Sequence, residues 1–301
     1  MTRPLVGALA AALFGAAAVT GLTAAPALAD APDTHAFGKS VSASTPAPAK
    51  KKHPSPTATP DFAGTVALSN CSGSVVRAPQ SQPTDPALVL SNGHCLQTGM
   101  PDPGEVVVDQ PSNRSFTLLD ANANDVATLH ASEMQYATMT DTDISVYQLD
   151  STYQEIESQY GIQALDLSPN HPTAGTDITV VSGYWKNTYS CSIDDFVYEL
   201  HEAGWVFKDS IRYTPECETI GGTSGSPIVN DATGEVVGVN NTGNNDGRTC
   251  TLNNPCEVDE NGNVTVREGI NYGQQTYLIT ECLGAGNQID LDLAGCELPR
   301  P

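Results

Sequence analysis

The stretch GGTSGSPIV, residues 221–229, places a serine among small residues just before a short apolar run. Its glycines let the backbone turn so that neighbouring N–H groups can point at one place. The N–H groups of Gly222 and Ser224 would then form an oxyanion hole, and the Ser224 hydroxyl would act as a nucleophile. A turn that only leads into a strand at residues 227–229 is the alternative, and the stretch by itself favours it. The rest of the sequence has to decide between a loop that carries a nucleophile and a simple turn.

A serine nucleophile needs a base, and the candidate is His94 in SNGHCL, residues 91–96. The imidazole follows an apolar run and directly precedes Cys95. A disulfide at that cysteine would hold the backbone under the ring rigidly, as a general base requires. A histidine with a purely structural role is the alternative at this position.

The third candidate is Asp143 in TDTDISVY, residues 140–147. It opens a run of alternating apolar residues, so its carboxylate could enter the interior and hold a histidine N–H. Asp141 competes for this role, and an ordinary aspartate at a strand end is a further alternative.

The order of these residues along the chain narrows the class of enzyme. His94, Asp143 and Ser224 follow the order His, Asp, Ser, whereas α/β-hydrolases follow the order Ser, Asp or Glu, His with a G-x-S-x-G elbow. No histidine follows Ser224, and Ser226 stands at the last position of the elbow. The lipase-type interpretation of Ser224 is therefore excluded.

Together the motifs GHC, DIS and GTSGSP resemble those of trypsin/chymotrypsin-like serine proteases, in the form found in the bacterial secreted, glutamyl endopeptidase-like branch. The likeness spans about residues 61–283. It implies an all-β fold of two packed six-stranded antiparallel barrels with a short C-terminal helix and the site between the barrels. It also implies that His94, Asp143 and Ser224 are catalytic, and that Gly222 and Ser224 form the oxyanion hole.

The same resemblance indicates where a substrate would bind. Glutamyl endopeptidases carry a histidine at the position of Asn240, and digestive trypsins carry an aspartate, which pairs with a new N-terminal ammonium, at the position of Thr223. Glu218 would favour a basic substrate side chain if it faced the pocket, whereas an exposed loop carboxylate is the alternative. The residues expected to line the primary pocket and the substrate-pairing strand are Thr219, Asn240, Asn241, Thr242 and Gly243.

Short runs of β-branched and apolar residues, separated by Gly, Pro, Asn and Asp, recur through the chain and are typical of an all-β fold. Helices are expected only at residues 154–160 and 276–283, and Asn261-Gly262 predicts a hairpin turn. The expected strands lie at residues 65–68, 74–76, 87–90, 106–108, 116–119, 144–147, 178–181, 227–229, 236–239 and 264–266.

The chain begins with a segment unlike the rest. Residues 1–29 combine a basic start, an apolar run and Ala27-Leu28-Ala29, which predicts a secretory signal peptide. Residues 30–60 are rich in Pro, Ala, Ser, Thr and Lys with few large apolar side chains, so we expect a disordered linker or pro-segment. Residues 61–301 are expected to form the protease domain, secreted and monomeric.

Charge and cysteine content fit an exported protein. Residues 61–301 hold 8 Lys plus Arg against 33 Asp plus Glu, which argues against nucleic acid or an anionic membrane as a partner. Eight cysteines in an oxidising compartment predict disulfides, and pairing in sequence order is the simplest of the many connectivities. No C-x-x-C pair or H-x-x-x-H cluster occurs, so we expect neither a metal nor another cofactor.

Proteins or peptides are the expected substrates. Two other functions remain open: a protease-fold binding protein that no longer cleaves, and an extracellular esterase with the same triad. Labelling by a fluorophosphonate separates the first of these from an enzyme, and a panel of substrates separates the second.

Overall fold

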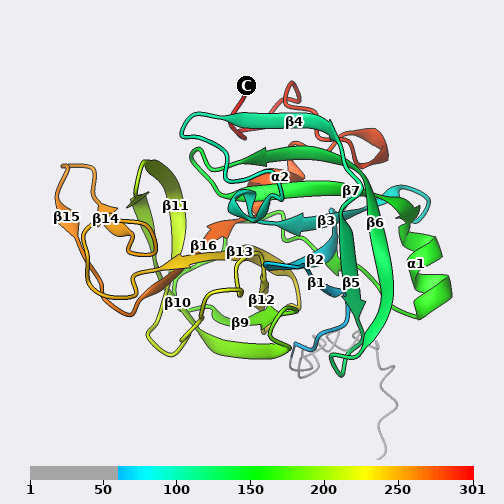
Figure 1. Cartoon of the computed structure of the whole chain (residues 1–301), viewed down its shortest axis with the longest axis horizontal. Helices are drawn as coiled ribbons and strands as arrows, with labels where there is room; N and C mark the ends of the chain where they lie inside the picture. The colour runs from blue at the N-terminus through cyan, green and yellow to red at the C-terminus, as the bar shows by residue number, and fades with distance from the viewer. Residues whose placement is uncertain (1–59) are drawn as a thin grey trace, which may run out of the picture. The chain divides into compact units, whose positions relative to one another are not determined.

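Two closed barrels of antiparallel strands make up most of the computed structural model, which describes residues 60–301 (Figure 1). The predicted signal peptide, and all but the last residue of the predicted linker, lie outside the described residues. None of the helices in the described part is long and apolar enough to cross a membrane.

The first barrel closes because its first two strands pair with each other as well as with their other neighbours. A short strand, β4 (Val106–Pro111), extends it beside β6 (Asp125–Thr138), and β8 (Leu165–Asp166) runs parallel to β2 (Ser72–Arg77). In order around the barrel, the strands are β1 (Thr65–Ala67), β5 (Ser115–Leu119), β6 (Asp125–Thr138), β7 (Ile144–Thr152), β3 (Pro86–Ser91) and β2 (Ser72–Arg77).

The second barrel closes through the long hairpin of β10 (Asn187–Glu202) and β11 (Trp205–Tyr213). A further hairpin, β14 (Cys256–Val258) and β15 (Val264–Thr265), extends from β10. In order around the barrel, the strands are β11 (Trp205–Tyr213), β16 (Asn271–Gln275), β13 (Val236–Gly243), β12 (Pro227–Asn230), β9 (Asp177–Ser182) and β10 (Asn187–Glu202). The predicted fold of two six-stranded antiparallel barrels is therefore confirmed.

Each barrel has its own apolar interior, and a third cluster lies between them. Phe116 and Leu118 are fully buried in the first barrel, and Ile178 and Ile211 are fully buried in the second. The cluster between the barrels joins side chains of β3 and β7 to side chains of β12 and β13. Consecutive buried Val, Ile and Leu residues, as in β3 and β9, explain why short apolar runs in the sequence predict an all-β fold.

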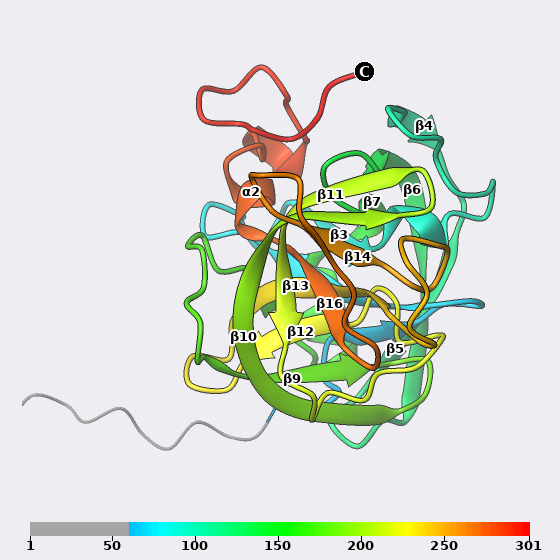
Figure 2. The ribbon, with the colours of Figure 1, turned by 90° about the vertical axis from the view of Figure 1, so that its left-hand side faces the viewer.

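The two helices lie near the positions that the sequence predicts. Helix α1 (Tyr153–Tyr160) begins with a capping box between Thr152 and Glu155 and ends at Gly161, which has a φ of 69°. Helix α2 (Tyr277–Thr280) is shorter than the predicted span and precedes the C-terminal segment (Figure 2). Its Ile279 packs into the cluster between the barrels.

Four disulfides join the cysteines in sequence order, as predicted: Cys71–Cys95, Cys191–Cys217, Cys250–Cys256 and Cys282–Cys296. The predicted hairpin turn at Asn261-Gly262 connects β14 and β15.

Candidate active site

An ion pair between His94 and Asp143 lies in a pocket that Ser224 also lines. The Nδ1 atom of His94 is 2.7 Å from Oδ2 of Asp143, and the backbone N–H of His94 donates to Oδ1 at 3.0 Å. Both carboxylate oxygens therefore contact one residue, which fixes the ring and its tautomer. Asp141, the competing candidate, instead pairs with Lys208.

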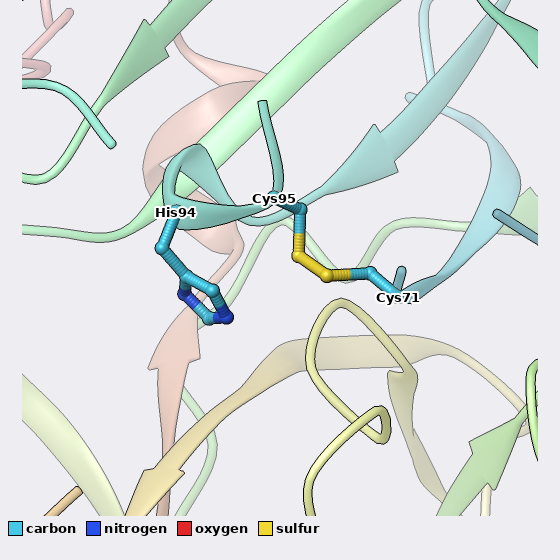
Figure 3. Close-up of side chains that lie close together, drawn as sticks. All are labelled: Cys71, His94 and Cys95. Carbon is cyan, nitrogen blue, oxygen red and sulfur yellow. A yellow bond between two sulfur atoms is a disulfide. The ribbon is translucent and has the colours of Figure 1, made fainter. Parts of the chain in front are cut away.

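The backbone under His94 is a single 3₁₀ turn, Gly93–Cys95, that directly follows β3. The disulfide from Cys95 to Cys71 ties this turn to the start of β2, as Figure 3 shows. The two sulfur atoms lie near the His94 ring, but a disulfide supplies no thiolate, so this cluster is not a set of metal ligands.

Asp143 is fully buried immediately before β7. Its carbonyl accepts a hydrogen bond from Nδ2 of Asn92 at 2.7 Å, and Oγ of Ser145 donates to the Asn92 carbonyl at 2.8 Å. These contacts join the turn that carries His94 to the strand that follows Asp143. The relative position of acid and imidazole is thus fixed by two neighbouring polar side chains, those of Asn92 and Ser145.

Ser224 follows a tight turn in which the N–H of Thr223 donates to the carbonyl of Ile220 at 3.0 Å. Gly222, at the third position, has a φ of 92°, which is the requirement of a type II turn. Gly225 has a φ of 80°, and a Cβ there would lie 2.1 Å from the carbonyl oxygen of Ser72. Both glycines are therefore needed by the backbone that presents Ser224.

A chain of buried hydrogen bonds supports this turn from beneath. The hydroxyl of Tyr213 donates to Oδ1 of Asn240 at 3.1 Å, and Nδ2 of Asn240 donates to Oγ1 of Thr223 at 3.0 Å. Thr223 in turn donates to the Ile220 carbonyl at 2.5 Å. Neutral groups thus hold the position where digestive trypsins use an aspartate and an ammonium.

Two residues that the sequence did not identify also hold the turn. Nε1 of Trp185 donates to the carbonyl of Gly221 at 2.8 Å. Oγ of Ser72 donates to the carbonyl of Gly222 at 3.3 Å, and its N–H donates to the carbonyl of Ser224 at 2.8 Å. Trp185 lies far from Gly221 in sequence, and Ser72 belongs to the other barrel, so no local pattern could reveal these contacts.

The Gly221 contact determines how the central peptide of the turn is oriented. The C=O and N–H of a trans peptide point in opposite directions. Because Trp185 holds the Gly221 carbonyl, the N–H of Gly222 points away from the indole. Within residues 60–301, the N–H groups of Gly222 and Ser224 donate to no protein atom, so both are available to a ligand.

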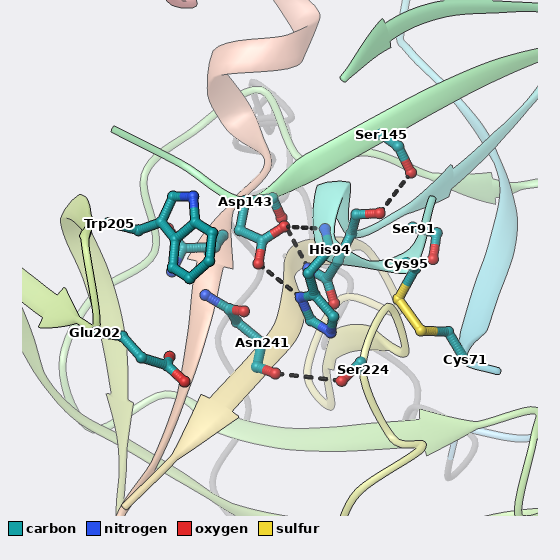
Figure 4. A network of polar contacts seen from close by, with 12 residues as sticks. Cys71, Ser91, His94, Cys95, Asp143, Ser145, Glu202, Trp205, Ser224 and Asn241 are labelled. Carbon is teal, nitrogen blue, oxygen red and sulfur yellow. Dashed lines mark hydrogen bonds and ion pairs between the residues drawn. A yellow bond between two sulfur atoms is a disulfide. The ribbon is translucent and has the colours of Figure 1, made fainter. Parts of the chain in front are cut away.

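The hydroxyl of Ser224 donates to the carbonyl of Asn241 at 3.4 Å (Figure 4). Figure 4 also shows the His94 ring lying between Asp143 and Ser224. In the described part of the chain, Ser224 makes no hydrogen bond to His94. Rotation of the hydroxyl would be needed to direct its proton at the imidazole, and catalytic hydrogen bonds are often loose without substrate.

The pocket contains all five predicted substrate-binding residues, whereas Gly222 lies outside its lining. Asn241 is an extra residue in β13 relative to β16, and such a bulge redirects side chains next to active sites. Glu218 is exposed and does not line the pocket, in agreement with the alternative of a loop carboxylate. The predicted residues in the pocket are His94, Asp143, Thr219, Ser224, Asn240, Asn241, Thr242 and Gly243.

Glu202, at the end of β10, is the functional candidate that the sequence did not reveal. Its side chain lines the pocket, yet the residue is only 6% exposed. Burial raises the pKa of Glu202, and hydrogen bonds from Thr242 and from the N–H of Asn253 oppose that rise. Nothing in the sequence around His201-Glu202 distinguishes it from the other acidic residues.

The charge state of His94 depends on both carboxylates. Burial by itself lowers the pKa of His94, but the charge and hydrogen bond of Asp143, together with the charge of Glu202, raise it above its ordinary value. The site therefore stabilises an imidazolium, as it must if His94 is to carry a proton during a reaction.

The model of the trypsin-like peptidase domain family matches residues 71–239. None of the curated proteins matches the chain. Solved structures that are similar include the MamO protease domain from Magnetospirillum magneticum, with 12% identity and a TM-score of 0.46 over 74% of this chain and 97% of that one. A Glu endopeptidase in complex with MPD has 16% identity and a TM-score of 0.41 over 71% of this chain and 85% of that one. A thermostable serine protease, AL20, from an extremophilic microorganism has 16% identity and a TM-score of 0.41 over 71% of this chain and 91% of that one.

Proposed function

Because the chain belongs to the family of trypsin-like peptidase domains, we propose that it is a secreted serine endopeptidase acting on proteins or peptides. The observation that carries the proposal is the 2.7 Å contact between His94 Nδ1 and Asp143 Oδ2 in a pocket shared with Ser224. That arrangement supports the predicted roles of His94 as base, Asp143 as orienting acid and Ser224 as nucleophile.

In the proposed reaction, Oγ of Ser224 attacks the scissile carbonyl carbon while its proton passes to Nε2 of His94. The N–H groups of Gly222 and Ser224 stabilise the oxyanion of the tetrahedral intermediate. The C–N bond then breaks, and His94 gives its proton to the leaving amine. Water, activated by His94, hydrolyses the acyl-enzyme and restores Ser224. Asp143 keeps the imidazole oriented and stabilises its charged form.

The neutral hydrogen bonds of Thr223 support activity without an ion pair to a new N-terminus. The amide of Asn240 is neutral and hydrogen-bonds within the protein through its oxygen and its nitrogen, so this residue offers no cation to a substrate carboxylate. We therefore do not expect a preference for glutamate before the cut. We propose that residues 1–29 are removed on export, that residues 30–60 link or precede the enzyme, and that residues 61–301 act as a monomer.

The test is Ser224→Ala, with Ser226→Ala as the matched control in the same loop. Removing the nucleophile is expected to lower kcat by about 10⁴-fold or more, with little change in folding. Ser226 is buried and does not line the pocket, so its variant should keep cleaving. Undiminished cleavage by Ser224→Ala would refute the proposal.

A fluorophosphonate should label Ser224 in the unmodified protein and leave Ser224→Ala unlabelled. A folded protein that shows neither labelling nor cleavage would favour the alternative of a binding protein that no longer cleaves. Cleavage of esters without cleavage of peptides would establish the esterase alternative.

A further inference from the structure

Three charged side chains line the pocket, and one of them has no counter-charge. His94 and Asp143 pair with each other, whereas Glu202 forms no ion pair within residues 60–301. Figure 4 shows its carboxylate directed toward Asn241. A buried carboxylate without a cation is costly unless a ligand supplies the charge.

The lysines and arginines of residues 60–301 form their contacts with groups other than Glu202. Both lysines of this part pair with surface aspartates, and every arginine except Arg114 pairs with a carboxylate other than that of Glu202. Arg114 donates to Tyr147 and Asn70 and does not line the pocket. No lysine or arginine of the described residues therefore neutralises Glu202, and His94, the one titratable group in the pocket that can become a cation, is paired with Asp143.

The hydrogen bonds of Glu202 locate it relative to a substrate. Oε1 accepts from the N–H of Asn253 at 2.6 Å, and the side chain of Thr242 is a second donor. Thr242 belongs to β13, the strand along which an extended peptide can pair. Because the Ser224 hydroxyl contacts the Asn241 carbonyl, the residue whose carbonyl is attacked lies opposite Asn241. In an antiparallel pairing, the preceding substrate residue then lies opposite Thr242.

From this placement we propose that Glu202 is a specificity-determining residue that selects a lysine or arginine immediately before the residue at which the substrate is cut. The inference rests on the proposed peptidase function and assigns a substrate class to the same site. The cationic side chain passes over Thr242 and pairs with the carboxylate of Glu202. Its charge offsets the cost of burying the acid, so basic peptides bind and react better than neutral ones.

The competing role for Glu202 is structural, because its bond to Asn253 anchors residues 250–254 beside the pocket. Glu202→Gln separates the two roles. A glutamine oxygen can still accept the Asn253 N–H, whereas the negative charge is lost. The measurement compares kcat/KM for two peptides that differ only in arginine or glutamine before the cleaved residue.

The unmodified enzyme is expected to prefer the arginine peptide by about tenfold, and Glu202→Gln should reduce that ratio to about one. On the pH-independent plateau, where a lower pKa of His94 in the variant has no effect, cleavage of the glutamine peptide should fall far less than cleavage of the arginine peptide. Equal losses for both peptides, or an unchanged ratio, would overturn the proposal.

If the proposed peptidase function itself is wrong, the same experiment gives a different result. If Ser224 is not the nucleophile, neither peptide is cleaved in a Ser224-dependent way, and the ratio cannot arise. Cleavage of both peptides at equal rates, abolished by Ser224→Ala, would leave the peptidase function standing and refute only the role of Glu202.

Discussion

At the scale of single residues, His94 receives its two carboxylate neighbours from different barrels. Asp143 comes from the start of β7 in the first barrel, and Glu202 comes from the end of β10 in the second. Burial opposes the charged imidazole, yet the two acids together outweigh it and raise the pKa of His94. The protonation of the proposed base is therefore controlled by packing across the interface as well as by its hydrogen-bonded partner.

This arrangement predicts the pH dependence of cleavage. The proposed base must be neutral to accept a proton, so kcat/KM should fall as the pH decreases through the pKa of His94, which lies above its ordinary value. Glu202→Gln removes one of the influences that raise this pKa, so the acidic limb should move to lower pH. The measurement is kcat/KM of a neutral peptide from pH 5 to 9 for both proteins. A shift to higher pH would contradict the assigned influence of Glu202.

At the scale of elements, the turn before Ser224 is held from two sides. Thr223 and Asn240 support it from the barrel interior, and Trp185 holds the Gly221 carbonyl from the loop between β9 and β10. Trp185 is 48% exposed, so its hydrogen bond rather than burial explains its position. We infer that the indole is a positioning residue for the N–H of Gly222.

Trp185→Phe keeps an aromatic ring but removes the donor to the Gly221 carbonyl. Without it, the central peptide can rotate, so we expect kcat to fall about three- to tenfold with little change in KM. A peptide aldehyde, which forms a tetrahedral adduct, should lose affinity by a similar factor. Tyr184→Phe, which changes the neighbouring ring without affecting this contact, is the matched control. A change confined to KM would argue against the positioning role.

At the scale of the whole molecule, residues 61–301 carry a large excess of acidic groups, with 33 Asp plus Glu against 8 Lys plus Arg. The summed field of such a surface attracts cations over distances comparable to the Debye length. This long-range attraction is independent of the single carboxylate of Glu202 and acts on the rate of encounter. It favours the same class of substrate that the pocket is proposed to select.

The ionic strength separates the long-range attraction by the acidic surface from the local pairing with Glu202. Raising the ionic strength from about 0.01 M to about 1 M shortens the Debye length from about 30 Å to about 3 Å. We expect kcat/KM of a cationic peptide to fall severalfold over this range, and that of a neutral peptide to change little. Glu202→Gln should show the same relative decrease, because the other acidic residues remain. Loss of the salt dependence in this variant would assign the attraction to Glu202 alone.

The sequence by itself determined the all-β architecture and predicted which side chains react. Short runs of Val, Ile and Leu bounded by Gly, Pro, Asn and Asp predicted the buried strands, because a strand that is packed on both faces buries consecutive residues. The long β10 was not recognised, since it carries many charged and exposed residues and its pairing partners set its conformation. His94, Asp143 and Ser224 could be predicted because their motifs are local and their order is distinctive.

Only the tertiary structure decided which side chains surround those three. Ser72 reaches the Ser224 loop from the other barrel, Trp185 reaches it from a distant loop, and Glu202 enters the pocket from the end of a hairpin. Each depends on contacts between residues far apart in the chain, which leave no local pattern of spacing. A carboxylate becomes a candidate for determining specificity when folding removes it from water without placing a cation beside it. The sequence shows that the acidic residue is present, but it does not show which groups surround that residue after folding.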